Sequence, residues 1–95
     1  MTYSTFAAHL NETFTAAHGP ASVELTLTEC VPLTTHPAPT DAPRQSFSLT
    51  FQGPVSAPLP QQIHTLHNPT LGQIHLFLVP LGPTGATFEY QAIFN

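Results

Sequence analysis

The chain has 95 residues, enough for one domain, and only 6% of them are Asp, Glu, Lys or Arg, against roughly 25% in ordinary soluble domains. Arg44 is the only strong cation, so the chain cannot neutralise a series of phosphates or an anionic membrane surface. Nucleic acid and membranes are therefore not expected as partners.

A helix is predicted over residues 2–17. Its apolar residues recur at spacings of three and four, which gathers them on one helical face; they are Tyr3, Phe6, Ala7, Leu10 and Phe14. The segment His18-Gly19-Pro20 ends the pattern with residues typical of a helix stop. We expect this helix to lie across one mouth or face of a sheet.

After residue 20 the hydrophobic period changes to two, which is typical of half-buried β-strands. Five strands are predicted, at residues 22–31, 45–52, 62–67, 73–80 and 86–94. No later segment has the pattern of a helix that could connect parallel strands. The sequence therefore predicts one mainly β domain over residues 1–95, an antiparallel five-stranded meander rolled into a small barrel or sandwich, with the helix as its lid.

A proline- and threonine-rich segment, TTHPAPTDAP at residues 34–43, separates the first two predicted strands. Its prolines favour extended conformations and remove backbone donors. It is long for a hairpin loop, so the segment is interpreted as either mobile or functional.

Three of the six histidines could form a metal site, namely His64, His67 and His75. If the strands at 62–67 and 73–80 pair as a hairpin about Thr70, residues whose numbers sum to 140 face each other. His67 and His75 then share one face diagonally, whereas His64 lies on the core face. Two imidazoles without a carboxylate or thiolate make a poor zinc site, so no metal is predicted, with His67 and His75 as the candidates if there is one.

No catalytic residue or cofactor is predicted, because the chain contains no nucleophile elbow, phosphate loop or dinucleotide-binding pattern. Cys30 is the only cysteine, and nothing near it in sequence lowers a thiol pKa, so it is interpreted as a small buried or half-buried side chain. Glu24 and Glu29 differ in parity, which would point them to opposite faces of a regular strand.

An interaction surface is predicted at Phe77 and Val79. They lie on the face of their strand opposite to Leu76 and Leu78, so that second apolar face must be covered by the helix or by another subunit. Arg44 is expected to pair with a carboxylate such as Glu89 or Glu24, or else to contact a partner.

Several segments carry a family resemblance that extends over almost the whole chain. They are FSLTFQGP (47–54), LPQQIHTLHNPTLG (59–72), LFLVP (76–80) and YQAIFN (90–95), together with Phe6 and His9-Leu10 near the start. In these the chain resembles a family of small bacterial proteins catalogued as a domain of unknown function. That family is loosely associated with genes for phage-tail-collar-like proteins, which implies an accessory or assembly role and no catalytic residues.

We expect a non-enzymatic structural or protein-interaction module that acts in an oligomer or a larger assembly. The low charge supports this, since uncharged polar surfaces resist association less well than charged ones. The alternative is a small ligand- or metal-binding protein or enzyme that uses histidines near a barrel mouth. No signal peptide or membrane span is visible, so the cytoplasm is the expected location.

Overall fold

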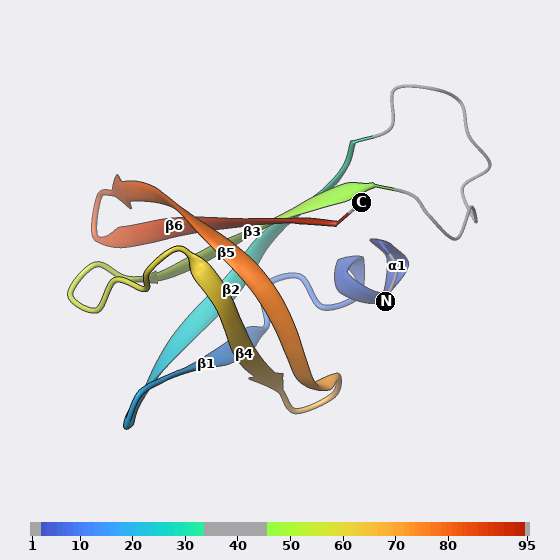
Figure 1. Cartoon of the computed structure of the whole chain (residues 1–95). Coiled ribbons are helices and arrows are strands. Elements are labelled where there is room, and N and C mark those ends of the chain that lie inside the picture. The colour runs from blue at the N-terminus through green and yellow to red at the C-terminus, as the bar shows by residue number, and fades with distance from the viewer. Residues whose placement is uncertain (1–2, 34–45, 95) are drawn as a thin grey trace.

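The computed structural model describes residues 3–33 and 46–94 of the chain. These form one short helix and six β-strands, namely α1 (Tyr3–Ala7), β1 (Thr13–His18), β2 (Ala21–Pro32), β3 (Phe47–Pro54), β4 (Gln62–Asn68), β5 (Gly72–Thr84) and β6 (Thr87–Phe94). The strands close into an antiparallel barrel in the order β1-β2-β3-β6-β5-β4 (Figure 1). The predicted fold class, a mainly β barrel with one N-terminal helix, is confirmed.

The predicted helix over residues 2–17 is wrong in its extent, and this is why the barrel has six strands rather than five. The helix ends at Ala7, and Asn11 takes a positive φ of 69° that no helix continues through. From there Phe14 and Ala16 are buried in alternation with exposed or half-buried residues, as in a strand. The position of Phe14 therefore fits both the helical spacing from Leu10 and the alternation of a strand.

The segment that was interpreted as a helix stop is the turn of the β1–β2 hairpin. His18 pairs with Ala21, which leaves Gly19 and Pro20 as a two-residue loop. Gly19 has a φ of 61°, and a left-handed first residue is what the primed turns of tight hairpins require. Glycine and proline are common both after the end of a helix and in the turn of a hairpin. The sequence alone therefore did not distinguish a helix stop from a hairpin turn.

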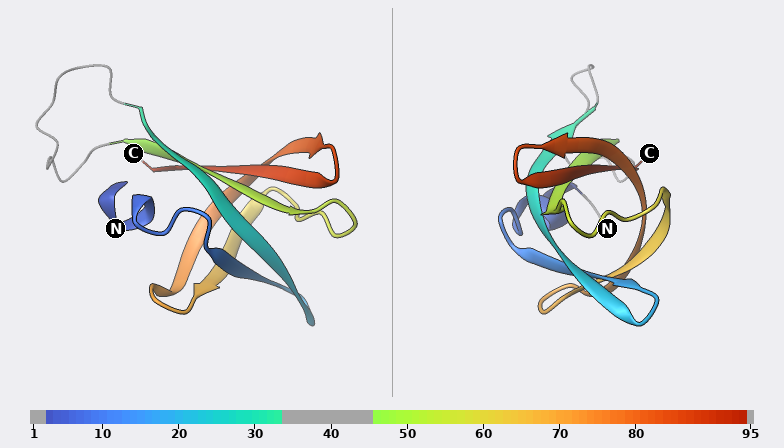
Figure 2. Two further views of the ribbon diagram at one scale, coloured as in Figure 1. Left: turned by 180° about the vertical axis from the view of Figure 1, so that it is seen from behind. Right: turned by 90° about the vertical axis from the view of Figure 1, so that its left-hand side faces the viewer.

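The barrel consists of two three-stranded meanders rather than one continuous meander. β1-β2-β3 and β4-β5-β6 are each joined in sequence, and they meet where β3 pairs with β6 and where β1 pairs with β4. Because β3 and β4 are not neighbours, the connection over residues 55–61 has to cross one end of the barrel (Figures 1 and 2). The five predicted strand ranges overlap β2 to β6.

A β-bulge in β2 changes which face its second half presents. The register with β3 shifts by one residue between Leu27 and Glu29, and Thr28 donates its hydroxyl to the carbonyl of Thr50. The extra residue restores Glu29 to the exposed face that Glu24 also occupies. The prediction that these two carboxylates point to opposite faces is therefore wrong.

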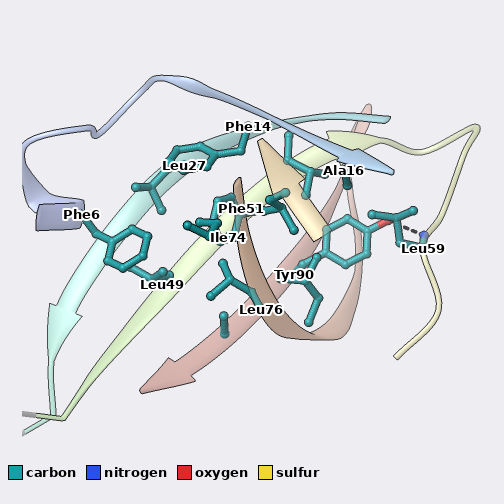
Figure 3. Packing of buried hydrophobic residues seen from close by; sticks show 14 of the residues in the cluster. Phe6, Phe14, Ala16, Leu27, Leu49, Phe51, Leu59, Ile74, Leu76 and Tyr90 are labelled. Carbon is teal, nitrogen blue, oxygen red and sulfur yellow. Dashed lines mark hydrogen bonds between the residues drawn. The ribbon is translucent and has the colours of Figure 1, made fainter. Parts of the chain in front are cut away.

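Large apolar side chains fill the interior of the barrel, as expected for so few strands. The buried core consists of Phe6, Phe14, Ala16, Val23, Leu25, Leu27, Phe47, Leu49, Phe51, Leu59, Leu66, Ile74, Leu76, Leu78, Tyr90 and Ala92. Figure 3 shows this cluster running from Phe6 at one end to Leu59 at the other. The interior is thus a packed hydrophobic core.

Each end of the barrel is closed by a segment outside the six strands. At one end α1 inserts Phe6, whose ring lies 5.9 Å from that of Phe47 and 5.3 Å from that of Phe94. At the other end the 55–61 connection inserts Leu59, whose backbone N–H donates to the Tyr90 hydroxyl at 2.8 Å (Figure 3). The helix therefore covers one mouth of the barrel, as predicted, although with a single turn.

The segment 34–43 and Arg44 lie outside the residues that the structure describes. Within the described part of the chain, no helix is long and apolar enough to cross a membrane.

The closure at Leu59 gives a first prediction. Replacing Tyr90 with Phe keeps the buried ring but leaves the Leu59 N–H without its acceptor, so the free energy of unfolding should fall by about 1–3 kcal/mol. Urea denaturation measures this. The same hydroxyl deletion at Tyr3, which packs edge-on against Phe47 through its ring, is the control and should change stability by less than about 0.5 kcal/mol. Equal losses in the two variants would contradict the role assigned to the Tyr90 hydroxyl.

Candidate functional site

The β4–β5 hairpin has the register predicted for it. Thr65 pairs with His75, His67 with Gln73 and His64 with Leu76, so each pair sums to 140. His64 is 2% exposed, and its Nε2 donates to the carbonyl of Pro60 at 2.7 Å. This histidine therefore fixes the 55–61 connection, and the three histidines do not converge.

His67 and His75 both lie on the outer face of the hairpin and are exposed. They occupy diagonal positions on neighbouring strands, the arrangement in which long side chains reach each other across a sheet. Nδ1 of His75 lies 3.1 Å from the hydroxyl of Thr65. His67 sits between Gln73 of β5 and Thr15 of β1.

The same outer face carries two large apolar side chains that pair directly. Ile63 lies opposite Phe77 in the register, and they are 66% and 49% exposed. Val79 follows on the same side of β5 and is half-buried. Sequence reasoning identified Phe77 but missed Ile63, although the same register rule pairs the two.

Nothing among the described residues covers this face. α1 packs against β2 and lies beside the C-terminal end of β6, away from the hairpin (Figure 1). Of the two covers expected for Phe77 and Val79, the helix or another subunit, the described helix does not supply one, and a cover by another subunit stays a prediction. We call this surface the hairpin face and define it by the outward residues Ile63, Thr65, His67, Gln73, His75 and Phe77.

The hairpin face contains no Asp, Glu, Lys or Arg. The carboxylates of the described residues are Glu12, Glu24, Glu29 and Glu89, and none of them belongs to β4 or β5. β2, which carries two of them, is separated from β4 by β1 and lies opposite β5 in the barrel, in front in the left view of Figure 2. The hairpin face is thus a neutral surface with an apolar row and an imidazole pair.

A second polar cluster, which sequence reasoning did not find, ties the start of β1 to the β4–β5 turn. Asn68 is fully buried, and its Nδ2 donates to Glu12 Oε1 and to the Thr13 carbonyl, both at 3.2 Å. Its Oδ1 accepts the backbone N–H groups of Thr70 and Leu71 at 2.9 and 3.0 Å. Both donors and the oxygen of the Asn68 amide are therefore occupied by structural hydrogen bonds. In the sequence, only the dipeptide Asn68-Pro69, which is typical of turns, pointed to this residue.

His9 completes this cluster. Its Nδ1 lies 2.9 Å from Glu12 Oε1, which is the geometry of an imidazole oriented by a carboxylate. The hydrogen bonds from His9 and, secondarily, from Asn68 hold the pKa of Glu12 below its usual range. Such a pair can serve a general base, but here the carboxylate is shared with Asn68. We interpret the cluster as structural.

Cys30 does not have the environment of a nucleophile. It packs partly buried against the core, and burial raises the pKa of its thiol, which favours the protonated form. Its Sγ lies 3.8 Å from the carbonyl of Tyr3. The interpretation of Cys30 as a half-buried structural residue agrees with this position.

The other carboxylates and histidines do not gather into a metal centre. Over residues 3–33 and 46–94, no three His, Cys, Asp or Glu side chains form a group that could hold a metal ion. Glu89 accepts hydrogen bonds from Gln52 and Thr84. The predicted pairing of Arg44 with Glu89 or Glu24 involves a residue outside the described range.

Comparison with known proteins places the chain in a family without an assigned activity. The chain belongs to the family described as a domain of unknown function, DUF6916, whose family model matches residues 1–94. No curated protein and no solved structure matches the chain. The resemblance to a domain of unknown function is thus confirmed, and any function has to be argued from the surface itself.

The Glu12 cluster predicts a specific dependence of stability on pH. Because the folded state lowers the pKa of Glu12, the stabilisation is fully present above the unfolded value, about 4.3, and is lost as the pH falls through the folded value. Wild type should therefore be more stable than Glu12→Gln near pH 6–7, and the difference should shrink as the pH falls below the unfolded value and close once the pH is below the lowered folded value. Thermal unfolding across this range measures it.

The control for this pH series is Glu29→Gln, which removes an exposed carboxylate from β2. A difference between wild type and Glu12→Gln that stays constant from neutral to acid pH would show that the carboxylate charge does not stabilise the cluster.

Proposed function

We propose that this domain is a non-enzymatic protein-interaction module that associates with a second copy of itself through the hairpin face. One observation supports this above the others: Ile63 and Phe77 lie directly opposite each other on a regular, paired part of the sheet and remain 66% and 49% exposed. Single exposed apolar residues are ordinary, but a cross-strand pair of large ones forms a contiguous apolar patch.

Burial of this patch in an interface would contribute favourably to the free energy of association. Complete burial of an Ile or Phe side chain is worth about 1.5–3 kcal/mol, and each of these residues has about half of that still to gain. A two-fold interface counts the contribution twice, because the same patch comes from both copies. The sum is enough to support association if the surrounding polar residues exclude water.

The choice of a second copy as the partner follows from charge. A surface that meets itself brings like charges together, and such contacts oppose association. The hairpin face has no charged residue, so two copies can meet on it without repulsion. Its polar members, Thr65 and Gln73, carry both donors and acceptors and can therefore hydrogen-bond to their own kind.

The proposal extends to a role in a larger assembly. The family resemblance described from the sequence, to small bacterial proteins associated with phage-tail-collar-like genes, suggests that the paired domain is an accessory component of such a structure. The low charge of the whole chain, 6%, supports a protein that functions in contact with other protein surfaces.

The test removes the apolar patch and measures association. Phe77→Gln should weaken self-association at least about tenfold, as judged from half the burial energy of one side chain in each copy. Light scattering coupled to size-exclusion chromatography over a concentration series, in EDTA, measures the dissociation constant. Leu81→Gln is the matched control, since Leu81 lies on the same strand and is 53% exposed, but it is the extra residue of the bulge between Pro80 and Gly82, outside the hairpin face.

Ile63→Gln should weaken association as Phe77→Gln does, and both variants should unfold near the wild-type temperature because the side chains are exposed. A wild-type chain that stays monomeric up to millimolar concentration would overturn the proposal. An equal effect of Leu81→Gln would overturn the assignment to the hairpin face.

A further inference from the structure

We propose that His67 and His75 are one half of a transition-metal site, which the same two residues of a second copy complete. This inference rests on the proposed function, because the second copy must meet the hairpin face. The chemical class of the ligand is a borderline divalent cation, with Zn²⁺ as the expected ion, because imidazole nitrogen is one of its preferred ligands.

The register places the two imidazoles for a shared ion. His75 pairs with Thr65, and His67 pairs with Gln73, so the histidines are diagonal neighbours on the same side of the sheet. Diagonal positions are about 7–8 Å apart, with the Cβ atoms somewhat closer. An ion between them can therefore be reached by both side chains in extended rotamers.

The contact with Thr65 orients one of the two ligands. Metal-binding histidines generally donate the N–H of their second ring nitrogen to a neighbouring oxygen, which fixes the tautomer. His75 has such an oxygen at 3.1 Å from Nδ1, the hydroxyl of Thr65. When Nδ1 donates to that oxygen, Nε2 keeps its lone pair and is the atom available to a metal.

The described residues of one chain do not complete the site. In the described part of the chain no third ligand joins the two histidines. Glu24 lies in the same cross-strand row, but it is two strands from His67, with Thr15 between them. The two backbones are therefore about 10 Å apart, and among the described residues Glu24 does not form a ligand group with the two histidines.

A two-fold axis along the hairpin supplies the missing ligands and also fits the apolar patch. Such an axis lies between the two apposed faces and runs parallel to the strands. It places each cross-strand pair of residues against the same pair of the partner. The Ile63–Phe77 row then meets its own copy, and the histidine pair meets the other pair. Sheets pack about 10 Å apart, so an ion midway between them lies about 5 Å from each, within reach of imidazoles with nitrogen–zinc distances near 2.0–2.1 Å.

The experiment uses the full chain without a histidine tag, first stripped with EDTA and then titrated with zinc chloride. Isothermal titration calorimetry should give one Zn²⁺ per two chains, and light scattering should show self-association at least about tenfold tighter with the metal than in EDTA. His67→Ala and His75→Ala should each abolish the zinc effect. Each variant is compared with itself in EDTA, so that any change in its metal-free association is separated from the loss of the zinc effect.

Two variants serve as controls. His18→Ala removes an exposed imidazole at the β1–β2 turn and should leave zinc binding unchanged. Gln73→Ala alters the hairpin face next to His67 without removing a ligand and should retain the stoichiometry of one ion per two chains.

Failure of this inference can be distinguished from failure of the proposed function. Self-association that depends on Phe77 but does not respond to zinc would refute the metal site and leave the proposed function intact. Zinc binding that survives His67→Ala, or that occurs once per chain without association, would also refute the shared site. A chain that stays monomeric with and without zinc would overturn both proposals.

Discussion

The pairing of β1 with β4, which closes the barrel, is the shortest strand pairing in the fold. Only two residue pairs, Thr15 with His67 and Ala16 with Leu66, join these strands, whereas eight consecutive pairs join β3 to β6. The buried Asn68 extends this short seam, since its amide holds both the Thr13 carbonyl and the Glu12 carboxylate. A buried polar group is stabilising only when its partners are all present, and Asn68 meets this condition. The N-terminal segment thereby becomes part of the barrel rather than a separate helix.

In a closed barrel of six strands the outer surface is the part that a partner can contact, and the proposed interaction is placed there for this reason. Its interior is filled by side chains, and α1 and the 55–61 connection close the two ends with Phe6 and Leu59 (Figure 3). Strand alternation then divides β4 into two sets of residues. The even-numbered His64, Leu66 and Asn68 are buried, while the odd-numbered Ile63 and His67 are exposed. The outer set can therefore serve a partner without disturbing the closure that the inner set provides.

The strands and their faces were largely predictable because alternation is a local signal. The β4–β5 register followed from a turn centred on Thr70, and it correctly separated His64 from His67 and His75. The helix failed because Phe14 satisfies both a helical and a strand period. The bulge at Thr28, the pairing of β3 with β6 and the His9–Glu12–Asn68 cluster depend on contacts distant in sequence, and no local pattern encodes them. Ile63 was missed for another reason: the register implied its position, but only the outward apolar residues of the strand at 73–80 were considered.

The low charge of the chain raises the question of why an apolar, neutral face would not lead to open-ended aggregation. Sheets aggregate mainly through free edges, which offer unpaired backbone groups to further strands. In this barrel every strand has two hydrogen-bonded neighbours, so a contact on the hairpin face is made by side chains alone. An interface that uses the same patch on both copies is closed once two copies have met. Charged residues are then not required on that face to limit growth, and their confinement to other elements agrees with a surface that pairs once. A shared metal ion would fix the same two-fold arrangement, because its ligand set is complete with the histidines of two chains.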